Sequence, residues 1–319
     1  MAESERRSKI HVGFDAALVL LGLPLAMLSL FPALPPSQWL STQLLIAQAI
    51  SFPIVLGVII IVVGLIFAAA RLFGAAVLAL LTALGLIVNP APPLFVERAP
   101  AGEKTLSVTT FNTLETLTPA GLQELIGEHD SDVIVLPEAS KKRVEAAVAG
   151  TAYEGNVVSS TDEVGVNATT VIVHSRLGTI EPVAGLETTL GAVTVRPSKL
   201  DVTIVGLHTM PPVPTAQRTW RADLERIDDY ARSTQDFTII AGDFNANLRH
   251  GPMTDLGAFW DTARLCSRYP SGTWPTDGLL GLRTHIDHVL VNRVVQVESC
   301  QVRSVDRSDH LAYTTRFRY

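Results

Sequence analysis

Several apolar runs after residue 100 end in side chains that can bind a cation or move a proton. They are Asn112, Glu138, His208, Asp243, Asn245, Asp287, Asp309 and His310. Charged side chains in or beside buried strands are costly unless they are paired or bind a cation. If these strand ends converge on one edge of a fold, they build an acidic cleft suited to a hard divalent ion, with histidines available for proton transfer. The residue types therefore predict a metal-dependent site.

Some of these residues have a simpler interpretation when each is taken alone. Asn112, Asp243 and Asn245 are common turn formers after strands. The D-x-N-x-N spacing that starts at Asp243 also begins like a calcium-binding EF-hand loop. Leu248 stands where that loop needs Gly, and Thr254 stands where it needs a bidentate Glu. This mismatch excludes the EF-hand interpretation.

The elements that must position these residues alternate between strands and helices. Runs rich in β-branched residues predict strands over 105–114, 132–140, 169–178, 192–197, 200–210, 236–244, 284–292, 294–302 and 311–319. Amphipathic spacing predicts helices over 118–129 and 215–233, and a short helix that closes at Gly150. Many strands with few helices between them favour two stacked sheets with helices outside.

The first part of the chain has a different character. The whole chain is 47% hydrophobic with a mean hydropathy of +0.30, and residues 16–90 contain one charged residue, Arg71. A transmembrane helix needs about 20 mainly apolar residues. The sequence predicts three such spans, at 16–34, within 44–70 and at 72–88. A cleaved signal peptide does not explain the later runs, and a buried hairpin of core helices would normally show a polar face.

The basic residues around these spans predict an orientation. Arg6, Arg7 and Lys9 precede the first span, Arg71 lies between the second and third, and the connection 35–43 contains no Lys or Arg. By the positive-inside rule, the N-terminus and the Arg71 turn are cytoplasmic. Three crossings then place everything after about residue 90 outside the cell. The predicted domains are a tail with three transmembrane helices (1–90), a linker (91–104) and a catalytic domain (105–319).

The charge of the outer part bears on its ligands. Four of the 25 basic and three of the 31 acidic residues precede residue 95, so the remainder carries a net charge of −7. A stably bound polyanion usually needs a basic face, so this balance disfavours nucleic acid as the main ligand. Cys266 and Cys300 both lie in this part; an oxidising compartment would allow them to pair, but free buried cysteines are equally expected.

The order N…E…H…GDFN…ID…SDH resembles the endonuclease/exonuclease/phosphatase superfamily, which includes deoxyribonuclease I, abasic-site endonucleases, sphingomyelinases and inositol-phosphate phosphatases. "GDFNA" from Gly242 and "SDH" from Ser308 are its most specific pieces, and "IDHVLV" stands between them. The resemblance covers roughly residues 105–319. It implies an α/β fold in which the three-helix transmembrane anchor precedes a four-layer αββα sandwich of two mixed β-sheets.

The resemblance also implies a metal group. Glu138 would be a principal ligand of Mg²⁺ (or Mn²⁺), with Asn112 close by and Asp309 helping to hold the ion. The region lacks the insertions with which abasic-site enzymes grip DNA, which again disfavours a DNA substrate.

The remaining residues receive catalytic roles from the same resemblance. Asp243 and Asn245 would flank the phosphate and orient or activate the attacking water. Asp287 would orient His310, and His208 would contact a phosphate oxygen or serve as an acid. In-line attack at phosphorus needs a deprotonated water, neutralised non-bridging oxygens and a proton for the leaving oxygen, so these residue types fit that reaction.

"SGTWPT" (271–276), followed by "LRTHIDHVLV", is similar to a membrane-anchored bacterial branch of the superfamily. Some members of that branch have several N-terminal spans, an extracytoplasmic catalytic domain and a role in glycopeptide resistance through prenyl-pyrophosphate hydrolysis. Trp274 and Pro275 also fit a packed loop. We expect a multi-pass plasma-membrane phosphohydrolase acting at the lipid bilayer on a phosphate ester or pyrophosphate, with a lipid-linked substrate favoured. A cell-surface nuclease acting on DNA or RNA and a catalytically inactive binding protein are the alternatives. The oligomeric state stays open.

Overall fold

The computed structural model describes residues 2–88, 104–129, 131–266, 272–278 and 282–319. The chain divides into two compact units. The helical unit comprises Met1–Ala91 and Leu248–Thr254, and the sandwich unit comprises Pro92–Asn247 and Asp255–Tyr319. The predicted linker at 91–104 lies outside the described residues except for Lys104.

Five helices form most of the helical unit. They are α1 (Ala2–Leu30), α2 (Pro35–Ser41), α3 (Ile46–Ser51), α4 (Pro53–Ala69) and α5 (Phe73–Val88). Within α1, the 22 residues Lys9–Leu30 are long and apolar enough to cross a membrane. Helices α4 and α5 are apolar but have only 17 and 16 residues. Of the three predicted spans, one therefore meets the length criterion, because the chain breaks at Phe52 and again at the Arg71 turn.

Proline affects α1 and α4 differently. The sequence places Pro24 and Pro53 inside the first two predicted spans, where a proline is expected to kink a helix. Pro24 does lie inside α1, but Pro53 is the first residue of α4. A proline at that position loses no helical hydrogen bond and already has a helical φ angle. The expectation for Pro53 was therefore wrong: it begins a helix.

Two polar side chains link separate segments of the helical unit. The carboxylate of Asp15 accepts hydrogen bonds from the backbone N–H groups of Gly74 and Ala75, at 3.0 and 2.8 Å, which caps the start of α5. In the segment Leu248–Thr254, the Arg249 guanidinium donates to the carbonyl of Leu86 at 2.5 Å.

The sandwich unit contains two six-stranded sheets. The first has the order β11-β12-β1-β2-β4-β3 and consists of β11 (Gln296–Ser304), β12 (Leu311–Arg318), β1 (Thr105–Thr110), β2 (Val133–Pro137), β4 (Thr169–Val173) and β3 (Val157–Ser159). The second has the order β5-β6-β7-β8-β10-β9 and consists of β5 (Ile180–Val183), β6 (Ala192–Pro197), β7 (Thr203–His208), β8 (Thr238–Asp243), β10 (Asp287–Val291) and β9 (Trp260–Asp261). Each sheet contains a parallel pair, β1–β2 or β7–β8, among antiparallel pairs. Both are therefore mixed, as predicted.

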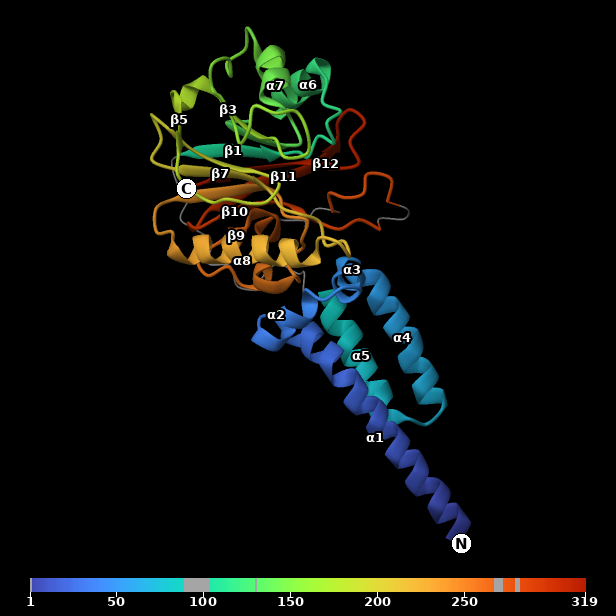
Figure 1. Cartoon of the computed structure of the whole chain (residues 1–319). Coiled ribbons are helices and arrows are strands. Elements are labelled where there is room, and N and C mark those ends of the chain that lie inside the picture. Colours follow the sequence, from blue (N-terminus) through green and yellow to red (C-terminus); the bar gives the residue numbers. More distant parts are fainter. Residues whose placement is uncertain (1, 89–103, 130, 267–271, 279–281) are drawn as a thin grey trace. The chain divides into compact units, whose positions relative to one another are not determined.

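Helices cover the outer faces of this sandwich. Helices α6 (Pro119–His129) and α7 (Lys141–Val148) lie outside the first sheet, and α8 (Gln217–Ser233) lies outside the second (Figure 1). The amphipathic α8 buries Trp220, Leu224 and Ile227 on one stripe. These residues lie on the apolar face that the 3.6-residue helical period of the sequence predicts.

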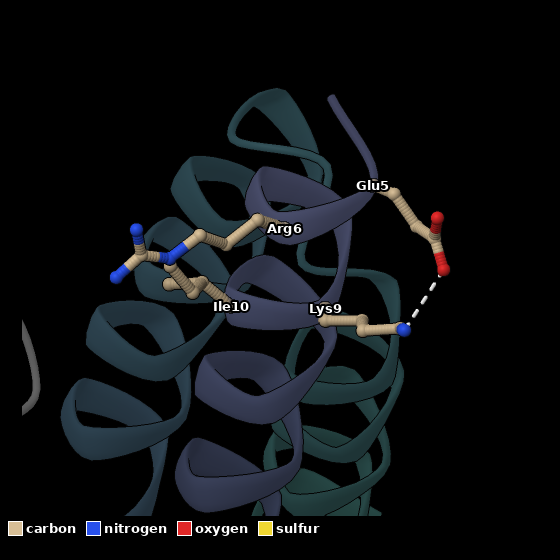
Figure 2. Close-up of a pocket in the computed structure, with 4 residues that line it drawn as sticks. All are labelled: Glu5, Arg6, Lys9 and Ile10. Carbon is tan, nitrogen blue, oxygen red and sulfur yellow. Dashed lines mark hydrogen bonds and ion pairs between the residues drawn. The ribbon is translucent and has the colours of Figure 1, made fainter. Parts of the chain in front are cut away.

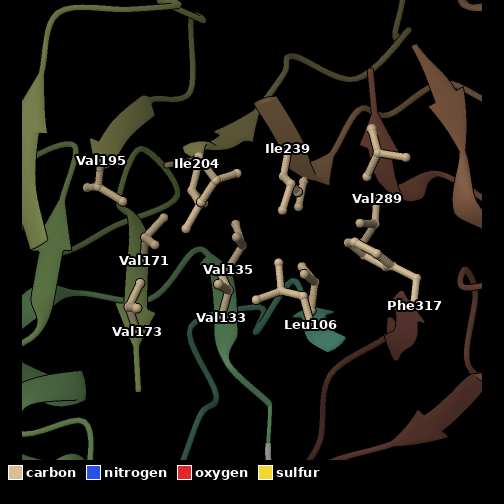
Figure 3. Packing of buried hydrophobic residues seen from close by; sticks show 14 of the residues in the cluster. Leu106, Val133, Val135, Val171, Val173, Val195, Ile204, Ile239, Val289 and Phe317 are labelled. Atoms are coloured by element: carbon tan, nitrogen blue, oxygen red, sulfur yellow. The ribbon is translucent and has the colours of Figure 1, made fainter. Parts of the chain in front are cut away.

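The main core lies between the two sheets. Val133, Val135 and Leu106 of the first sheet face Ile204 and Ile239 of the second (Figure 3). These side chains are almost fully buried. β-branched residues alternate toward this layer because successive side chains of a strand point to opposite faces. The same alternation leaves the strand ends free to carry polar residues at the edge.

A disulfide joins Cys266 and Cys300, which the sequence left open. Cys300 lies on β11, and Cys266 follows the short 3₁₀ helix Thr262–Leu265. The bond closes a loop with a sequence separation of 34 residues. It therefore ties the edge of the first sheet to a segment that leads out of the second.

Removing this disulfide is expected to destabilise the protein. Loop closure over 34 residues implies a loss of about 3–4 kcal/mol in the free energy of unfolding. The measurement is urea unfolding of the full chain in detergent, comparing the wild type with Cys266→Ala/Cys300→Ala. A double variant avoids an odd thiol. Equal unfolding midpoints for the two proteins would contradict the expectation.

Candidate active site

Strand register brings three of the predicted residues into one row. His208 lies opposite Asp243 in the parallel pair β7–β8, and Asp243 lies opposite Asp287 in the antiparallel pair β8–β10. Neighbouring strands are about 5 Å apart, so these residues become neighbours although they are distant in sequence. All three are buried.

The loop after β8 presents Asp243 and Asn245. A Cβ atom at Gly242 would lie 2.0 Å from the carbonyl oxygen of Leu207, so only glycine allows β7 and β8 to approach here. The Asp243 carboxylate accepts a hydrogen bond from the backbone N–H of Asn245 at 2.8 Å. The Asn245 amide donates to the carbonyl of Thr209 at 2.9 Å. The two residues are therefore turn formers and members of the cluster at once.

Asn112 connects the two sheets at this edge. Its side-chain amide donates to a carboxylate oxygen of Glu138 at 3.0 Å and to one of Asp243 at 2.9 Å. Glu138 has a φ of +59°, a strained conformation for a non-glycine residue, which often marks a functional position. Burial raises the pKa of Glu138, although the Asn112 hydrogen bond and His208 oppose this, and the Asp243 carboxylate raises it further. The site thus concentrates negative charge.

His310 is held by Asp287 and faces Asp243. Its Nδ1 lies 2.9 Å from Oδ2 of Asp287, and its Nε2 lies 3.8 Å from Oδ2 of Asp243. Burial disfavours the charged ring, but the carboxylates of Asp287 and Asp243 outweigh it and raise the pKa of His310 to about 10. Without a cation bound nearby, His310 is therefore an imidazolium at neutral pH.

His208 lies on the opposite side of the same carboxylates. Its Nδ1 is 3.1 Å from the carbonyl oxygen of Val166, so Nδ1 carries the proton that is donated there. Its Nε2 points into the cluster, 3.6 Å from Asp243 and 3.8 Å from Glu138. This nitrogen also lies 3.5 Å from the side-chain amide of Asn245. It can bond a phosphate oxygen only when it, too, carries a proton.

Asp309 belongs to the edge of the site. Its side chain is 46% exposed, and its Oδ1 lies 4.0 Å from Nε2 of His310. The indole N–H of Trp274 donates to Oδ2 of Asp309 at 2.9 Å. Trp274 thus orients Asp309, a role that sequence reasoning missed, because no local pattern distinguishes an anchoring Trp from one that packs in a loop.

The residues present fit a divalent cation. Among the described residues, Oδ1 of Asp287 and Oδ1 of Asp309 are buried oxygens without a hydrogen-bond partner. Ligand atoms of Asp243, Asp287 and His310 lie within 4.8 Å of one another. Carboxylate and amide oxygens are the ligands that Mg²⁺ and Mn²⁺ prefer. A bound cation would balance the excess negative charge of this cluster.

Another described hollow of the surface has no comparable chemistry. It lies on α1 and is lined by Glu5, Arg6, Lys9 and Ile10, where Glu5 and Lys9 form an exposed ion pair at 2.8 Å (Figure 2). Its charges are solvated and its one carboxylate is already paired. The candidate site is therefore the strand-end cluster.

Next to this cluster lies a second buried group, Asp261, His285 and His288. Burial lowers the pKa of His285 to about 4, and the charge of His288 acts in the same direction. His285 is therefore neutral in the folded protein and becomes charged on unfolding at acidic pH.

This difference predicts a pH-dependent stability. Between the ordinary histidine pKa of 6.5 and the folded value of about 4, the unfolded chain binds the extra proton, so stability falls as pH falls through that window. The shift corresponds to about 3 kcal/mol. Urea unfolding at pH 7 and pH 4.5 measures it, with His285→Phe as the variant that keeps an aromatic ring but cannot titrate. Identical pH dependence in wild type and variant would contradict the prediction.

Comparisons with known proteins agree with the fold. The Endonuclease/Exonuclease/phosphatase family profile matches residues 109–310. The chain is similar in structure to humanized TDP2 of D. rerio with 14 mutations, at 14% identity and a TM-score of 0.54, covering 67% of this chain and 99% of that one. It is also similar to an AP endonuclease from Archaeoglobus fulgidus (17% identity, TM-score 0.50, 66% and 98% covered). A third similar structure is an endonuclease/exonuclease/phosphatase from Beutenbergia cavernae DSM 12333 (19%, 0.52, 68% and 72%). A comparison with curated protein sequences finds no match.

At these identities the similar structures show the fold, whereas the family profile covers more than half of the chain. The matched segment runs through every residue of the cluster from Asn112 to His310. Members of this family are metal-dependent enzymes that act on phosphoester bonds. The chain therefore belongs to the endonuclease/exonuclease/phosphatase family and is a metal-dependent phosphoester hydrolase.

Proposed function

We propose that this protein is a membrane-anchored, extracytoplasmic phosphohydrolase that cleaves a phosphate ester or pyrophosphate of a lipid-linked substrate with Mg²⁺ or Mn²⁺. The observation that carries the proposal is an apolar rim around an acidic, histidine-containing site. Leu114, Val164, Val166 and Val213 are exposed, and Val164 is 70% exposed.

These apolar side chains lie on the loops that hold the site. The backbone N–H of Leu114 donates to the side chain of Asn112 at 3.0 Å, and the carbonyl of Val166 binds His208. Val213 lies in the loop that follows His208 at the end of β7. Exposed apolar groups beside a phosphate site favour a substrate that joins a phosphate to a hydrocarbon chain. A polyanionic nucleic acid would instead favour basic groups at this rim.

The helical unit supports anchorage in a bilayer. Its helices meet through small residues, because a Cβ at Gly57 would lie 2.9 Å from Ile87 and one at Gly64 would lie 3.3 Å from Ala79. Apolar side chains such as Ile59 and Leu84 are exposed on α4 and α5. Water would not stabilise these faces, but lipid would. We therefore assign α4 and α5 to the membrane together with Lys9–Leu30, although they are short.

Charge and redox chemistry support the orientation. Arg6, Arg7, Lys9 and Arg71 mark one side of the predicted spans as cytoplasmic. The Cys266–Cys300 disulfide fits an oxidising, extracytoplasmic compartment.

The proposed chemistry assigns a role to each side chain. Asp287 holds Nδ1 of His310, so Nε2 is the atom that protonates the leaving oxygen. Asp243 and Asn245 orient the attacking water, and Asp243 accepts its proton. Nε2 of His208, when protonated, donates to a phosphate oxygen. Glu138, Asn112 and Asp309 would hold the cation. When bound, it would neutralise charge on the phosphate oxygens.

A substrate comparison tests the proposal. Full-length protein in detergent with Mg²⁺ or Mn²⁺ is assayed for phosphate release from prenyl pyrophosphates and lipid phosphates, and for cleavage of plasmid DNA and RNA. We expect lipid substrates to be turned over and Glu138→Ala to abolish the release. Cleavage of plasmid DNA or RNA without hydrolysis of any lipid phosphate would overturn the lipid assignment in favour of a nuclease.

The orientation has its own test. A phosphatase reporter that is active only outside the cytoplasm, fused after Tyr319, is expected to be active in intact cells. An inactive reporter on a protein that is expressed and inserted would contradict the extracytoplasmic assignment.

A further inference from the structure

His288 is a fully buried histidine whose two ring nitrogens both face acceptors. Its Nδ1 lies 2.7 Å from Oδ2 of Asp261, and its Nε2 lies 2.8 Å from the carbonyl oxygen of Ala246. Neither a carboxylate nor a carbonyl can supply a hydrogen, so both hydrogen bonds form only if both nitrogens carry a proton. The ring is therefore an imidazolium that joins two segments.

The two joined segments are strand β9 and the loop after β8. Asp261 is fixed on β9, where its other carboxylate oxygen accepts from the backbone N–H of Ala263 at 2.8 Å. Ala246 lies in the loop after β8, directly after Asn245, whose φ is +46°. The charged ring thus ties this loop to the neighbouring strands.

The loop is held on its other side as well. The hydroxyl of Thr209 donates to the carbonyl of Phe244 at 2.6 Å, and the N–H of Phe244 donates to the carbonyl of Ile286 at 2.9 Å. These bonds fix the residue before Asn245, and the bond from His288 fixes the residue after it. Hydrogen bonds from a charged donor are generally stronger than neutral ones, so the bond from His288 contributes strongly to holding this loop.

A metal ion is the competing explanation, because Asp261, His285 and His288 have ligand atoms within 4.8 Å of one another. A histidine binds a metal only through an unprotonated nitrogen. Binding through His288 would therefore release either Asp261 or Ala246. The hydrogen-bonded arrangement favours a positioning role.

We propose that His288, held by Asp261, is a positioning residue that fixes the Ala246 carbonyl and thereby aligns Asn245 and Asp243 with the substrate phosphate. The inference rests on the proposed hydrolysis at this site. It adds a second Asp–His pair, Asp261–His288, beside Asp287–His310, with a conformational role in place of proton transfer; β10 contributes His288 to one pair and Asp287 to the other. Adjacent residues of a strand point to opposite sides, so β10 can serve both pairs.

Kinetics of the full-length enzyme test the proposal, using the lipid phosphate that it hydrolyses or bis(p-nitrophenyl) phosphate with Mn²⁺. For His288→Phe and Asp261→Asn we expect kcat to fall by about a hundredfold, since a misplacement of about 1 Å has that effect. KM should change little, because alignment of the water matters mainly in the transition state. His288→Gln should retain more activity than His288→Phe, because a Gln amide can still donate to the Ala246 carbonyl.

Tyr153→Phe is the matched control for lost stability. Tyr153 is equally buried and loses one hydrogen bond, to the carbonyl of Ser131 at 2.6 Å, under the helices of the first sheet. We expect it to lower the unfolding midpoint while kcat stays at the wild-type value. A kcat unchanged in His288→Phe, or equal losses of kcat in His288→Phe and Tyr153→Phe, would show that His288 is only structural.

Two further measurements test the role of His288 without any substrate. ¹⁵N NMR of the histidine rings should show a doubly protonated His288 at neutral pH, and Asp261→Asn should remove that signal even if no substrate is found. Metal analysis should give the same metal content for the wild-type full chain and for His288→Gln. A singly protonated ring, or a bound ion that depends on His288, would overturn the positioning role and assign a metal site.

Discussion

Replacing His310 with Ala is expected to lower kcat by about 10²- to 10⁴-fold, the range that general acid catalysis contributes. The ring is oriented by Asp287 at 2.9 Å and lies 3.8 Å from Asp243, and no other described side chain bonds to the same Asp287 oxygen. Its loss therefore removes the proton donor and also leaves the buried Asp287 carboxylate unpaired. Initial rates of phosphate release with saturating substrate and Mg²⁺ measure the effect.

Two further variants show whether the loss of activity is specific to the Asp287–His310 pair. Asp287→Asn should lower kcat nearly as much, because the amide no longer fixes the protonated ring in its orientation. His174→Gln is the matched control: His174 lies outside the site and binds the backbone N–H of Arg176, so kcat should not change. Retention of wild-type kcat in folded His310→Ala would remove His310 from the mechanism.

Replacing Glu138 with Gln is expected to have the second large effect, a loss of metal affinity. Glu138 is held by Asn112 at 3.0 Å in a strained backbone conformation, and its neighbours Asp243 and His208 converge on the same space. Even groups that only orient a metal ligand contribute about 10- to 100-fold to affinity. We therefore expect the loss at Glu138 to reach at least the upper end of that range. Calorimetric titration of Mn²⁺ into the full-length protein measures the affinity.

The control for this experiment is Glu163→Gln. Glu163 is an exposed acid on the loop before β4 and is not part of the cluster. It removes the same charge and should leave Mn²⁺ affinity unchanged. Equal losses in both variants would indicate a general effect of charge, and unchanged affinity in Glu138→Gln would contradict a ligand role.

The main elements of the sandwich were predictable because burial repeats with the period of each element. The strand predicted over 192–197 has those bounds in the structure, and the helix predicted over 215–233 spans Gln217–Ser233. The short strands β3, β5 and β9 were missed, since two to four residues carry too little alternation to distinguish a strand from a loop.

The helical unit shows the limit of composition as a guide. Apolar runs indicated helices correctly, but not where each one begins. Phe52 separates α3 from α4, and the length of each helix depends on where the chain turns. Hydropathy averages over such breaks, so it overstates the length of a continuous span.

By itself, the sequence determined the chemical inventory of the site: the carboxylates, amides and histidines that follow apolar runs, and the motifs "GDFNA" and "SDH". Only the tertiary structure decided how these groups meet. The row His208–Asp243–Asp287, the Asn112 bridge between sheets and the His288 fastening all join residues that are distant in sequence. A shift of one residue in strand register would turn each side chain to the opposite face. Such contacts depend on how strands pair across the whole unit, which no local spacing encodes.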